Sequence, residues 1–499
     1  MRKRLNNLYP FFSLLIGLTL AQILAMAHVY LSNTGLYDSL LAIKSAGYLT
    51  IPNSHVMGQL RKPAPAFFGG LFFTFSIGAG ISFLSLALAW IWDRLFYRKI
   101  FLLYVFLLLW VACLAAFNFH GFKLFVTLYF LLIAPVVFIT ATKQMSYLNK
   151  KNQRSRPNEI LHILPVIVLA LLLAWQIDSR MFSDFRDIYL LSNPVGSKIN
   201  TFYYKYTLYP AEVFKSLNQK MLKTAMIESQ KTDVTRMLEN IILNDDYIPI
   251  QRNIDADLKI VSTGNDFIFK SHDRPVLRIS AVEFFQDSHG AITEFEQKSD
   301  TWAFFRKITM FSLLSGFPLA VYVIVHGIIS ILFGIFFNLR TSSLIASILC
   351  FIVCLVFIFS FQLNRTRNIS ERNIADVLGS GRWQDRVAAL KFIDKNGLEI
   401  KQFHTYPELL RSDYIAERYW FVRTLANSRK PGTYRDLLGF LNDTHPNVAS
   451  MALYGLGRRG NKEAIDKIMQ VIKTSDDWYL QWYAYRALRE LGWRQMKLN

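Results

Sequence analysis

Cysteine is scarce in this sequence, whose 499 residues include only Cys113, Cys350 and Cys354. All three lie in long apolar runs, so the more polar parts of the chain can form neither a disulfide framework nor a CxxC metal site. The motif CxxCH is also absent, which excludes covalently attached haem. Cys350 and Cys354 share a helix face, and we interpret them as small packing residues.

Carboxylates are missing from the interior of every long apolar run. Ion-coupled transporters usually carry Asp or Glu in such runs, because a buried carboxylate can bind and release the driving ion. The sequence therefore argues against a secondary active transporter.

Apolar residues, in contrast, make up 52% of the chain, and charged residues only 18%. Such totals are typical of membrane proteins. Runs of about 20 apolar residues can cross a hydrocarbon core about 30 Å thick. They occur at 9–31, 67–92, 100–119, 122–141, 160–177, 308–337 and 342–363. We predict a polytopic α-helical membrane protein with about 7 spans.

Two of these runs allow two interpretations each. Arg2, Lys3 and Arg4 precede the first run as in a signal peptide, but the length of the run and the lack of a cleavage site favour an uncleaved signal anchor. The sixth run is interrupted by Gly316 and Pro318, so it could be one tilted or kinked span, or a span followed by a re-entrant piece.

Basic residues set the orientation, because cytoplasmic loops are enriched in Lys and Arg. With the N-terminus in the cytoplasm, the short outer loops hold only Lys44, Arg61, Lys62 and Lys123. The segment 178–304 is then extracytoplasmic. The C-terminal part follows it to the same side, although the arginines directly after the last span argue against this. The expected domains are 1–177 with spans 1–5, 178–304, 305–363 with spans 6 and 7, and 364–499.

The formal net charge of +20 resembles that of a nucleic-acid-binding protein. Most of the excess, however, lies in loops that flank the spans and in the C-terminal part, where anionic lipid attracts it. We expect membrane lipid, and no nucleic acid, among the partners.

His326 is the intramembrane candidate, because it lies near the middle of the sixth run. It could be a haem ligand, a quinone contact or a proton relay. Since no second mid-span His accompanies it, we prefer a neutral His bonded to a neighbouring helix. The second run is rich in Gly and Ser, including Gly78 and Gly80, and this favours a tightly packed helix over one that lines a lipid groove.

The segment 178–304 is predicted to be a small α+β domain. Residues 211–243 have apolar residues at helical spacing, whereas DLKIVS, NDFIFKS, PVLRISAVEFF and AITEF alternate like strands. A local acidic cluster lacks the Gly and Glu spacing of a calcium-binding loop, so we interpret it as a solvated turn. Its members are Asp245, Asp246, Asp255 and Asp257. No metal site or cofactor is predicted.

The C-terminal part contains a repeated pattern of small and apolar residues. It occurs at Ala389, Leu390, Ile393; Phe421, Val422, Leu425; Ala452, Leu453, Leu456; and Ala487, Leu488, Leu491. The second residues of these sets follow one another at steps of 32, 31 and 35, a period typical of solenoids. Helical segments lie between the sets, so each unit is a helix pair.

Two of these units, HPNVASMALYGLG and DDWYLQWYAYRALRELG, resemble HEAT-type repeats, with a proline or acidic turn before the second helix and an Ala-Leu-x-x-Leu-Gly ending. The resemblance covers about residues 372–495, while 1–370 resemble no recognised family. The second unit departs from the pattern, because Phe421 and Val422 replace Ala-Leu and no Gly follows. Regular stacking is therefore in doubt there.

An α-solenoid of this kind implies binding rather than catalysis. Aromatic and Arg side chains dominate binding hot spots, and the last two units carry Trp478, Tyr479, Trp482, Arg486, Arg458 and Arg459. We predict that these residues form a surface for a partner protein. Alternatively, they belong to the core, cap the solenoid or rest on the membrane.

These features together predict an integral membrane scaffold, or a subunit or assembly factor of a larger envelope complex, in a bacterial inner membrane. It would dock a partner protein through its repeats, and no catalytic residue is assigned. A membrane enzyme acting on lipid or lipid-linked sugar is one alternative, and would use Asp38, Asp184 or Asp187. A lipid-handling or transport protein built around Gly78 and Gly80 is another.

Overall fold

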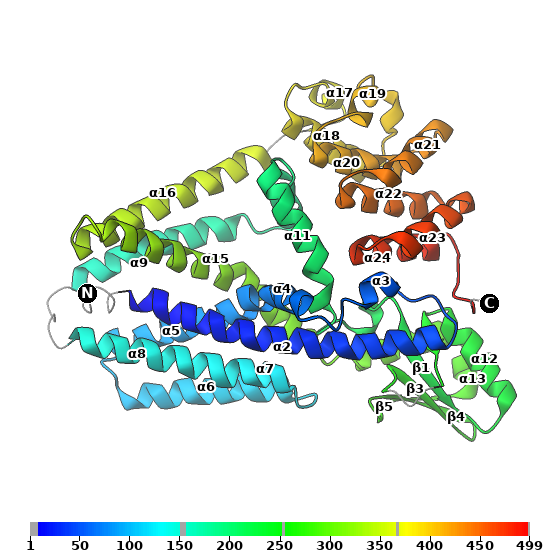
Figure 1. Ribbon diagram of the computed structural model, residues 1–499, viewed down its shortest axis with the longest axis horizontal. Helices are drawn as coiled ribbons and strands as arrows, with labels where there is room; N and C mark the ends of the chain where they lie inside the picture. The colour runs from blue at the N-terminus through cyan, green and yellow to red at the C-terminus, as the bar shows by residue number, and fades with distance from the viewer. Residues whose placement is uncertain (1–7, 150–155, 252–254, 366–368, 498–499) are drawn as a thin grey trace.

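The computed structural model describes residues 8–149, 156–251, 255–365 and 369–497. Figure 1 shows long helices running side by side. The N-terminus lies at one end of this bundle, and a β-sheet and a stack of short helices lie at the other end. The sheet and the stack of short helices therefore share one end of the bundle.

Six helices among the described residues are long and apolar enough to cross a membrane. They are Tyr9–Ser45 (α2), Pro63–Arg94, Ile100–Asn118 (α6), Leu124–Tyr147, Ala303–Phe333 (α15) and Arg340–Arg365. The second of them consists of α4 (Pro63–Phe73), η1 (Thr74–Gly78) and α5 (Ala79–Arg94). The fourth consists of α7 (Leu124–Leu128), η2 (Tyr129–Ile133) and most of α8 (Ala134–Asn149), and the sixth belongs to α16 (Leu339–Arg365). These positions agree with six of the predicted runs.

The fifth predicted run, 160–177, corresponds to α9 (Arg156–Trp175). Within the part of α9 whose side chains are described, Val166–Trp175 is apolar, and this part is shorter than a span. The side chains of 156–165 lie outside the described part of the structure. A seventh span therefore stays a prediction.

The sixth predicted run forms one continuous helix, α15, with Pro318 in its interior. It crosses α5 closely, since a Cβ atom added to Gly80 would lie 2.4 Å from Ser312 Oγ, and one added to Gly316 would lie 2.6 Å from Gly80 Cα. Gly78 approaches Ala21 of α2 in the same way, at 2.5 Å. Small residues thus let these backbones pack together, as the packing interpretation of the second run predicts.

The segment after α9 first forms α10 (Met181–Phe185), η3 (Arg186–Leu190) and α11 (Pro194–Ala211), and then a five-stranded sheet. The strand order is β2-β1-β3-β4-β5. Strand β1 runs parallel to β2 and β3, and β3, β4 and β5 form an antiparallel meander. The strands are β1 (Lys223–Glu228), β2 (Tyr247–Pro249), β3 (Leu258–Thr263), β4 (Asp266–Ser271) and β5 (Arg274–Ser280).

Helices complete this α+β domain, whose core contains the fully buried rings of Phe269, Phe284 and Phe295. The remaining short elements of this part are η4 (Leu217–Gln219), α12 (Thr232–Leu243), α13 (Ala281–Gln286) and α14 (Ser288–Lys298). Helix α3 (Ser54–Met57) follows α2 at the same end of the molecule.

Two local predictions for this domain are wrong. The segment Lys223–Glu228, predicted as helix, forms the strand between β2 and β3. The alternating stretches after β5, predicted as strands, form α13 and α14. Ser280 and Glu283 make a capping box at α13, and Asp287 accepts the backbone N–H of Gly290 at α14. These local caps outweigh the alternating pattern.

The C-terminal part is a stack of helix pairs. Its elements are α17 (Ile374–Leu378), α18 (Trp383–Asn396), η5 (Ile400–Gln402), α19 (Tyr406–Leu410), α20 (Ile415–Leu425), α21 (Pro431–Gly439), η6 (Phe440–Asn442), α22 (Pro446–Arg459), η7 (Lys462–Ala464), α23 (Ile465–Thr474) and α24 (Trp478–Glu490). The small and apolar residues of the repeated pattern are all at most 3% exposed. Helix α20, with Phe421 and Val422 fully buried, packs between α18 and α22. The departure in the second unit therefore leaves the stacking intact.

Candidate functional site

The candidate functional site is the stack of repeat helices together with the surfaces that hold it. His326, the intramembrane candidate, lies outside it in α15. Its Nε2 atom is 3.2 Å from Ser347 Oγ of α16, and its ring stacks against Tyr322 at 6.1 Å. His326 thus links two neighbouring helices, as the preferred interpretation predicts.

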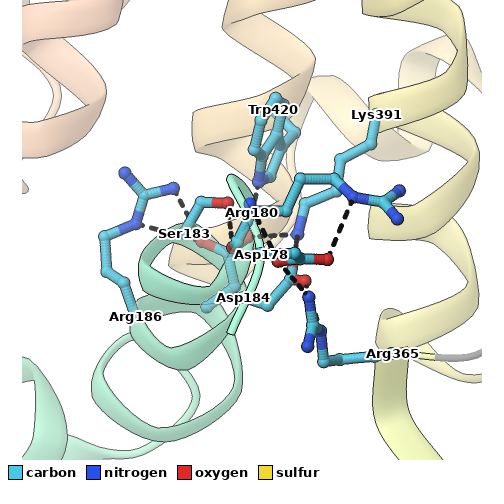
Figure 2. A network of polar contacts seen from close by, with 9 residues as sticks. Asp178, Arg180, Ser183, Asp184, Arg186, Arg365, Lys391 and Trp420 are labelled. Carbon is cyan, nitrogen blue, oxygen red and sulfur yellow. Dashed lines mark hydrogen bonds and ion pairs between the residues drawn. The ribbon is translucent and has the colours of Figure 1, made fainter. Parts of the chain in front are cut away.

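The first two repeats are attached by a group of charged and polar residues, the Asp187 junction, formed by Asp184, Asp187, Arg365, Lys391 and Trp420. Figure 2 labels Asp184, Arg365, Lys391 and Trp420 in this network. Lys391 Nζ of α18 lies 2.6 Å from Asp187 Oδ2 and 2.8 Å from Asp184 Oδ1. Trp420 Nε1 of α20 donates to Asp187 Oδ2 over 2.7 Å. Arg365, at the end of α16, pairs with Asp184 Oδ2 at 2.8 Å. The junction thus ties two repeats to α10, η3 and α16.

Burial and charge act in opposite directions on Asp187, which is 1% exposed. Burial raises the pKa of its carboxyl, but Arg186 and Lys391 lower it by more, so the pKa lies below 3.8. Arg186 Nη2 is 2.7 Å from Asp187 Oδ1 and its guanidinium lies 3.9 Å from the ring centre of Tyr419. Asp187 is therefore ionised and compensated on both sides.

The third and fourth repeats rest on α11. Asn200 Nδ2 donates to Asn447 Oδ1 of α22 over 2.7 Å, and both residues are buried. The ring of Trp478 meets Tyr209 edge to face at 5.2 Å, and the ring of Tyr479 meets Tyr204 at 4.6 Å. These polar and aromatic contacts fix α22 and α24 against the same helix.

The last repeat also contacts the sheet domain and the segment after α2. Tyr485 Oη donates to Asp246 Oδ1 over 2.5 Å. Asn53 Nδ2 donates to the carbonyl of Ile472 over 2.8 Å, and its backbone N–H donates to Gln481 Oε1 over 2.8 Å. The second helix of each pair is thus bound to the rest of the chain; these helices are α18, α20, α22 and α24.

The residues predicted as a partner surface are divided by this arrangement. Trp478 is 6% exposed and Tyr479 half-buried, both against α11. Arg459 donates to the carbonyls of Leu425 and Lys430 within the stack. The remaining three, Trp482, Arg486 and Arg458, are half-buried or exposed, with Arg486 lying 4.7 Å from the ring centre of Trp482. These three keep an outward surface, so their partner role stays a prediction.

The predicted acidic cluster near β2 and β3 does not converge on one point. Asp245 lies 2.6 Å from His289 and Asp255 lies 2.5 Å from His272, while Asp257 pairs with Lys220 at 2.7 Å. Asp246 contacts the last repeat helix. Among the described residues, no three His, Cys, Asp or Glu side chains lie together as they would to hold a metal ion.

A shallow hollow of about 430 Å³ lies where the end of α19, the start of α20 and the end of α21 meet. In its lining, Asp436 accepts a hydrogen bond from Tyr406 Oη over 2.5 Å, and Asp443 pairs with Arg418 at 2.9 Å. Arg411 and Arg435 also line it, and both are exposed. Within the part of the chain that the structure describes, neither arginine has a charged partner. The hollow therefore offers two free guanidinium groups.

Several residues of the site were missed by sequence reasoning. Asn53 and Asn200 carried no signal, and Asp187 and Asp184 stood out only as acidic residues for an enzyme. Their partners lie far along the chain: Asp187 and Trp420 are 233 positions apart. No local pattern connects such residues.

The comparisons with known proteins bear on the same part of the chain. Residues 406–489 match the sequence profile of HEAT repeats. This match confirms the resemblance for the region from α19 to α24. The comparisons with curated proteins and with solved structures found no match.

Proposed function

We propose that this chain is an integral membrane scaffold, acting as a subunit or assembly factor of a larger envelope complex, that presents its HEAT repeats to a partner protein. The observation that carries the proposal is the attachment of α18, α20, α22 and α24 to the rest of the chain. It gives the stack a fixed position. The first helices of the second and third pairs, α19 and α21, lie on the side of the stack away from the apolar helices (Figure 1).

Insertion in a bacterial inner membrane, with the N-terminus in the cytoplasm, is part of the proposal. Helix α6 supports it, because only 6% of its most apolar stretch is buried, and such a surface suits contact with lipid. Arg98 lies in the loop between α5 and α6, and Arg340 lies in the first turn of α16, directly after the α15–α16 connection. Both connections are at the end of the bundle where the N-terminus lies (Figure 1), as expected for the cytoplasmic side. The sheet domain and the repeats contact each other, so both would be extracytoplasmic.

The hollow between α19 and the end of α21 indicates the chemistry of the partner. Arg411 and Arg435 are free to bind carboxylates, and guanidinium groups do so with two parallel hydrogen bonds. Repeat stacks generally bind extended segments of other proteins along such a surface. We infer that the partner offers an acidic segment.

The two alternative functions receive less support. Asp38, in the last third of α2, pairs with Arg61 at 2.6 Å, and Asp184 and Asp187 are paired with Lys391. A carboxylate held in this way is poorly placed to act as a general base for an enzyme. The spaces beside Gly78 and Gly80 are filled by Ala21 and Ser312, which leaves little room for lipid to pass there.

The test compares full-length proteins purified in mild detergent from their native membrane. Arg411→Glu combined with Arg435→Glu should abolish binding of the partner, because two attractive charges become repulsive. Arg429→Glu combined with Lys467→Glu makes the same charge change at exposed positions outside the hollow, and should retain the partner. Increasing salt should weaken the wild-type complex.

Equal recovery of the same proteins with both double variants would contradict the proposal. Removing residues 372–499 would be a poorer test, because it uncovers Asp187, Asn200 and Asp246, which the repeats cover. The truncated chain could lose partners, or gain chaperones, for that reason alone.

A further inference from the structure

The end of α16 nearest the repeats forms one wall of a second hollow, of about 620 Å³. Its wall is apolar and includes Ile352, Val356, Phe359 and Leu363, which recur at helical spacing and so lie on one face. Val356 is 64% exposed and Leu363 71% exposed. In a helix that crosses a membrane, such a face contacts lipid chains or another apolar helix.

The polar end of this hollow is formed by Arg382, which belongs to the turn before α18. Its side chain is exposed and has no charged partner within the described residues. Asn364, in the last turn of α16, also lines the hollow. The hollow therefore changes from apolar to cationic where α16 ends, that is, where the membrane surface would lie.

The dimensions fit one leaflet of a bilayer. The 12 steps from Ile352 to Asn364 rise about 18 Å along the helix axis, and half of a hydrocarbon core is about 15 Å thick. A phospholipid has the same order of groups over this length, with an apolar chain followed by a charged phosphate. An apolar helix of a partner protein would match the wall but carries no anionic group for Arg382, whereas a phosphate forms charge-assisted hydrogen bonds with a guanidinium.

We propose that α16 and Arg382 bind one anionic phospholipid of the leaflet on the repeat side, with an acyl chain along Val356, Phe359 and Leu363 and the phosphate at Arg382. This inference rests on the membrane insertion proposed above. The site joins a lipid to the first repeat, because Arg382 directly precedes α18.

The experiment uses the full-length protein in mild detergent, titrated with phosphatidylglycerol or phosphatidylcholine carrying the same acyl chains. Native mass spectrometry gives the affinity of the first bound lipid. The wild type should prefer phosphatidylglycerol, and Arg382→Gln should weaken that binding about fivefold, the loss expected for one surface contact with an anionic lipid. Binding of phosphatidylcholine should not change.

Three variants make the result specific. Arg382→Lys keeps the charge and should keep most of the preference. Arg429→Gln removes an exposed charge outside the hollow and should bind lipid as the wild type does. Val356→Trp fills the wall and should weaken both lipids. An unchanged preference in Arg382→Gln, or an equal loss in Arg429→Gln, would overturn the proposal.

Two further measurements separate the possible failures. Glycerol phosphate, a headgroup without acyl chains, should not compete, and effective competition would show that the wall binds no chain. Alkaline extraction of native membranes tests insertion itself. A protein released by this treatment would refute the proposed insertion, whereas a retained protein with an unaffected Arg382→Gln variant would refute only the lipid site.

Discussion

The indole Nε1 of Trp420 donates a hydrogen bond to Asp187 Oδ2 over 2.7 Å, and it thereby joins the second repeat to the segment that leaves the apolar helices. Trp420 is 9% exposed and Asp187 1% exposed. Because the two residues belong to different parts of the chain, the attachment of the repeats can be tested without changing the repeats' own core.

Asp187→Asn should loosen this attachment. The substitution keeps the size of the side chain but leaves Arg186 uncompensated and Lys391 with Asp184 alone, and breaking a buried ion pair costs about 3 kcal/mol. Hydrogen exchange of the α18 and α20 amides should report this loss as a lower opening free energy.

Asp246→Asn is the matched control at the other end of the stack. Burial raises the pKa of Asp246 more than Tyr485 and Arg489 lower it, so a neutral side chain suits this position better than it suits position 187. An amide oxygen can still accept the hydrogen bond of Tyr485. We expect a loss of no more than about 1 kcal/mol, and equal losses in the two variants would contradict this assignment of charge.

The third repeat should become less stable in mild acid because of His445. Burial lowers the pKa of this His from 6.5 to about 4 in the folded chain. Between these values the unfolded chain binds a proton that the folded chain does not bind, so stability falls as the pH falls from 6.5 to 4. We expect a loss of about 2 kcal/mol over this window, allowing for partial solvation, measured by hydrogen exchange in α22.

His445→Asn provides the control for this titration. His445 Nδ1 accepts the backbone N–H of Asn447 at the start of α22, at 3.3 Å, and an Asn side chain can accept the same hydrogen bond without titrating. The pH dependence in α22 should therefore vanish. A dependence of stability on pH that persists in the variant would show that another group titrates in this window. Asp187 is not that group, because its lowered pKa means that its stabilising contribution is lost only in stronger acid, below pH 3.8.

Trp478→Ala should destabilise the packing of the last repeat on α11 by about 3–5 kcal/mol, because it removes a large buried ring and leaves a cavity against Tyr209. Trp482→Ala should cost clearly less, since Trp482 is half-buried. Thermal unfolding in detergent compares the two variants. Equal melting temperatures would show that the contact with α11 contributes little.

Gly80→Leu should prevent correct assembly of the helix bundle. Any Cβ atom at this position would overlap Ser312 of α15, and the backbone would have to move. Gly35→Leu is the control, because a Cβ atom added at this position of α2 would have no heavy atom within 4 Å outside its own stretch of helix. Size-exclusion profiles of the detergent-solubilised proteins should show loss of the monodisperse peak in the first variant only. A monodisperse Gly80→Leu protein would reopen the interpretation of the second apolar run as a lipid groove.

The parts of the fold that could be predicted from the sequence are those with a repeated pattern. Runs of apolar residues located six long helices, and the recurrence from Leu390 to Leu488 located the second helices of the stack. Each of these signals is the sum of many weak preferences along one segment. Errors occurred where one or two side chains decide the structure, as at Ser280 and Asp287, whose caps turn an alternating stretch into helices.

The candidate site was less predictable, for a different reason. The sequence predicts Trp478 either as part of a partner surface or as a core or capping residue, and in the structure its ring contacts Tyr209 of the same chain. The residue type indicates that an aromatic ring suits an interface. It does not indicate whether the ring contacts another protein or a distant segment of the same chain. Arg411, Arg435 and Arg382 stand out only when their neighbours in space are known, because no carboxylate among the described residues pairs with them.

The place of the last repeat has a consequence for the biosynthesis of the protein. Leu49 accepts a hydrogen bond from Gln495, 446 positions later, and Asn53 binds Gln481, 428 positions later. The segment after α2 is therefore made and exposed long before the residues that cover it are translated. A chain released early by the ribosome would leave the polar groups of Leu49 and Asn53 uncovered. Quality-control proteases can distinguish incomplete chains from finished ones by such exposed groups.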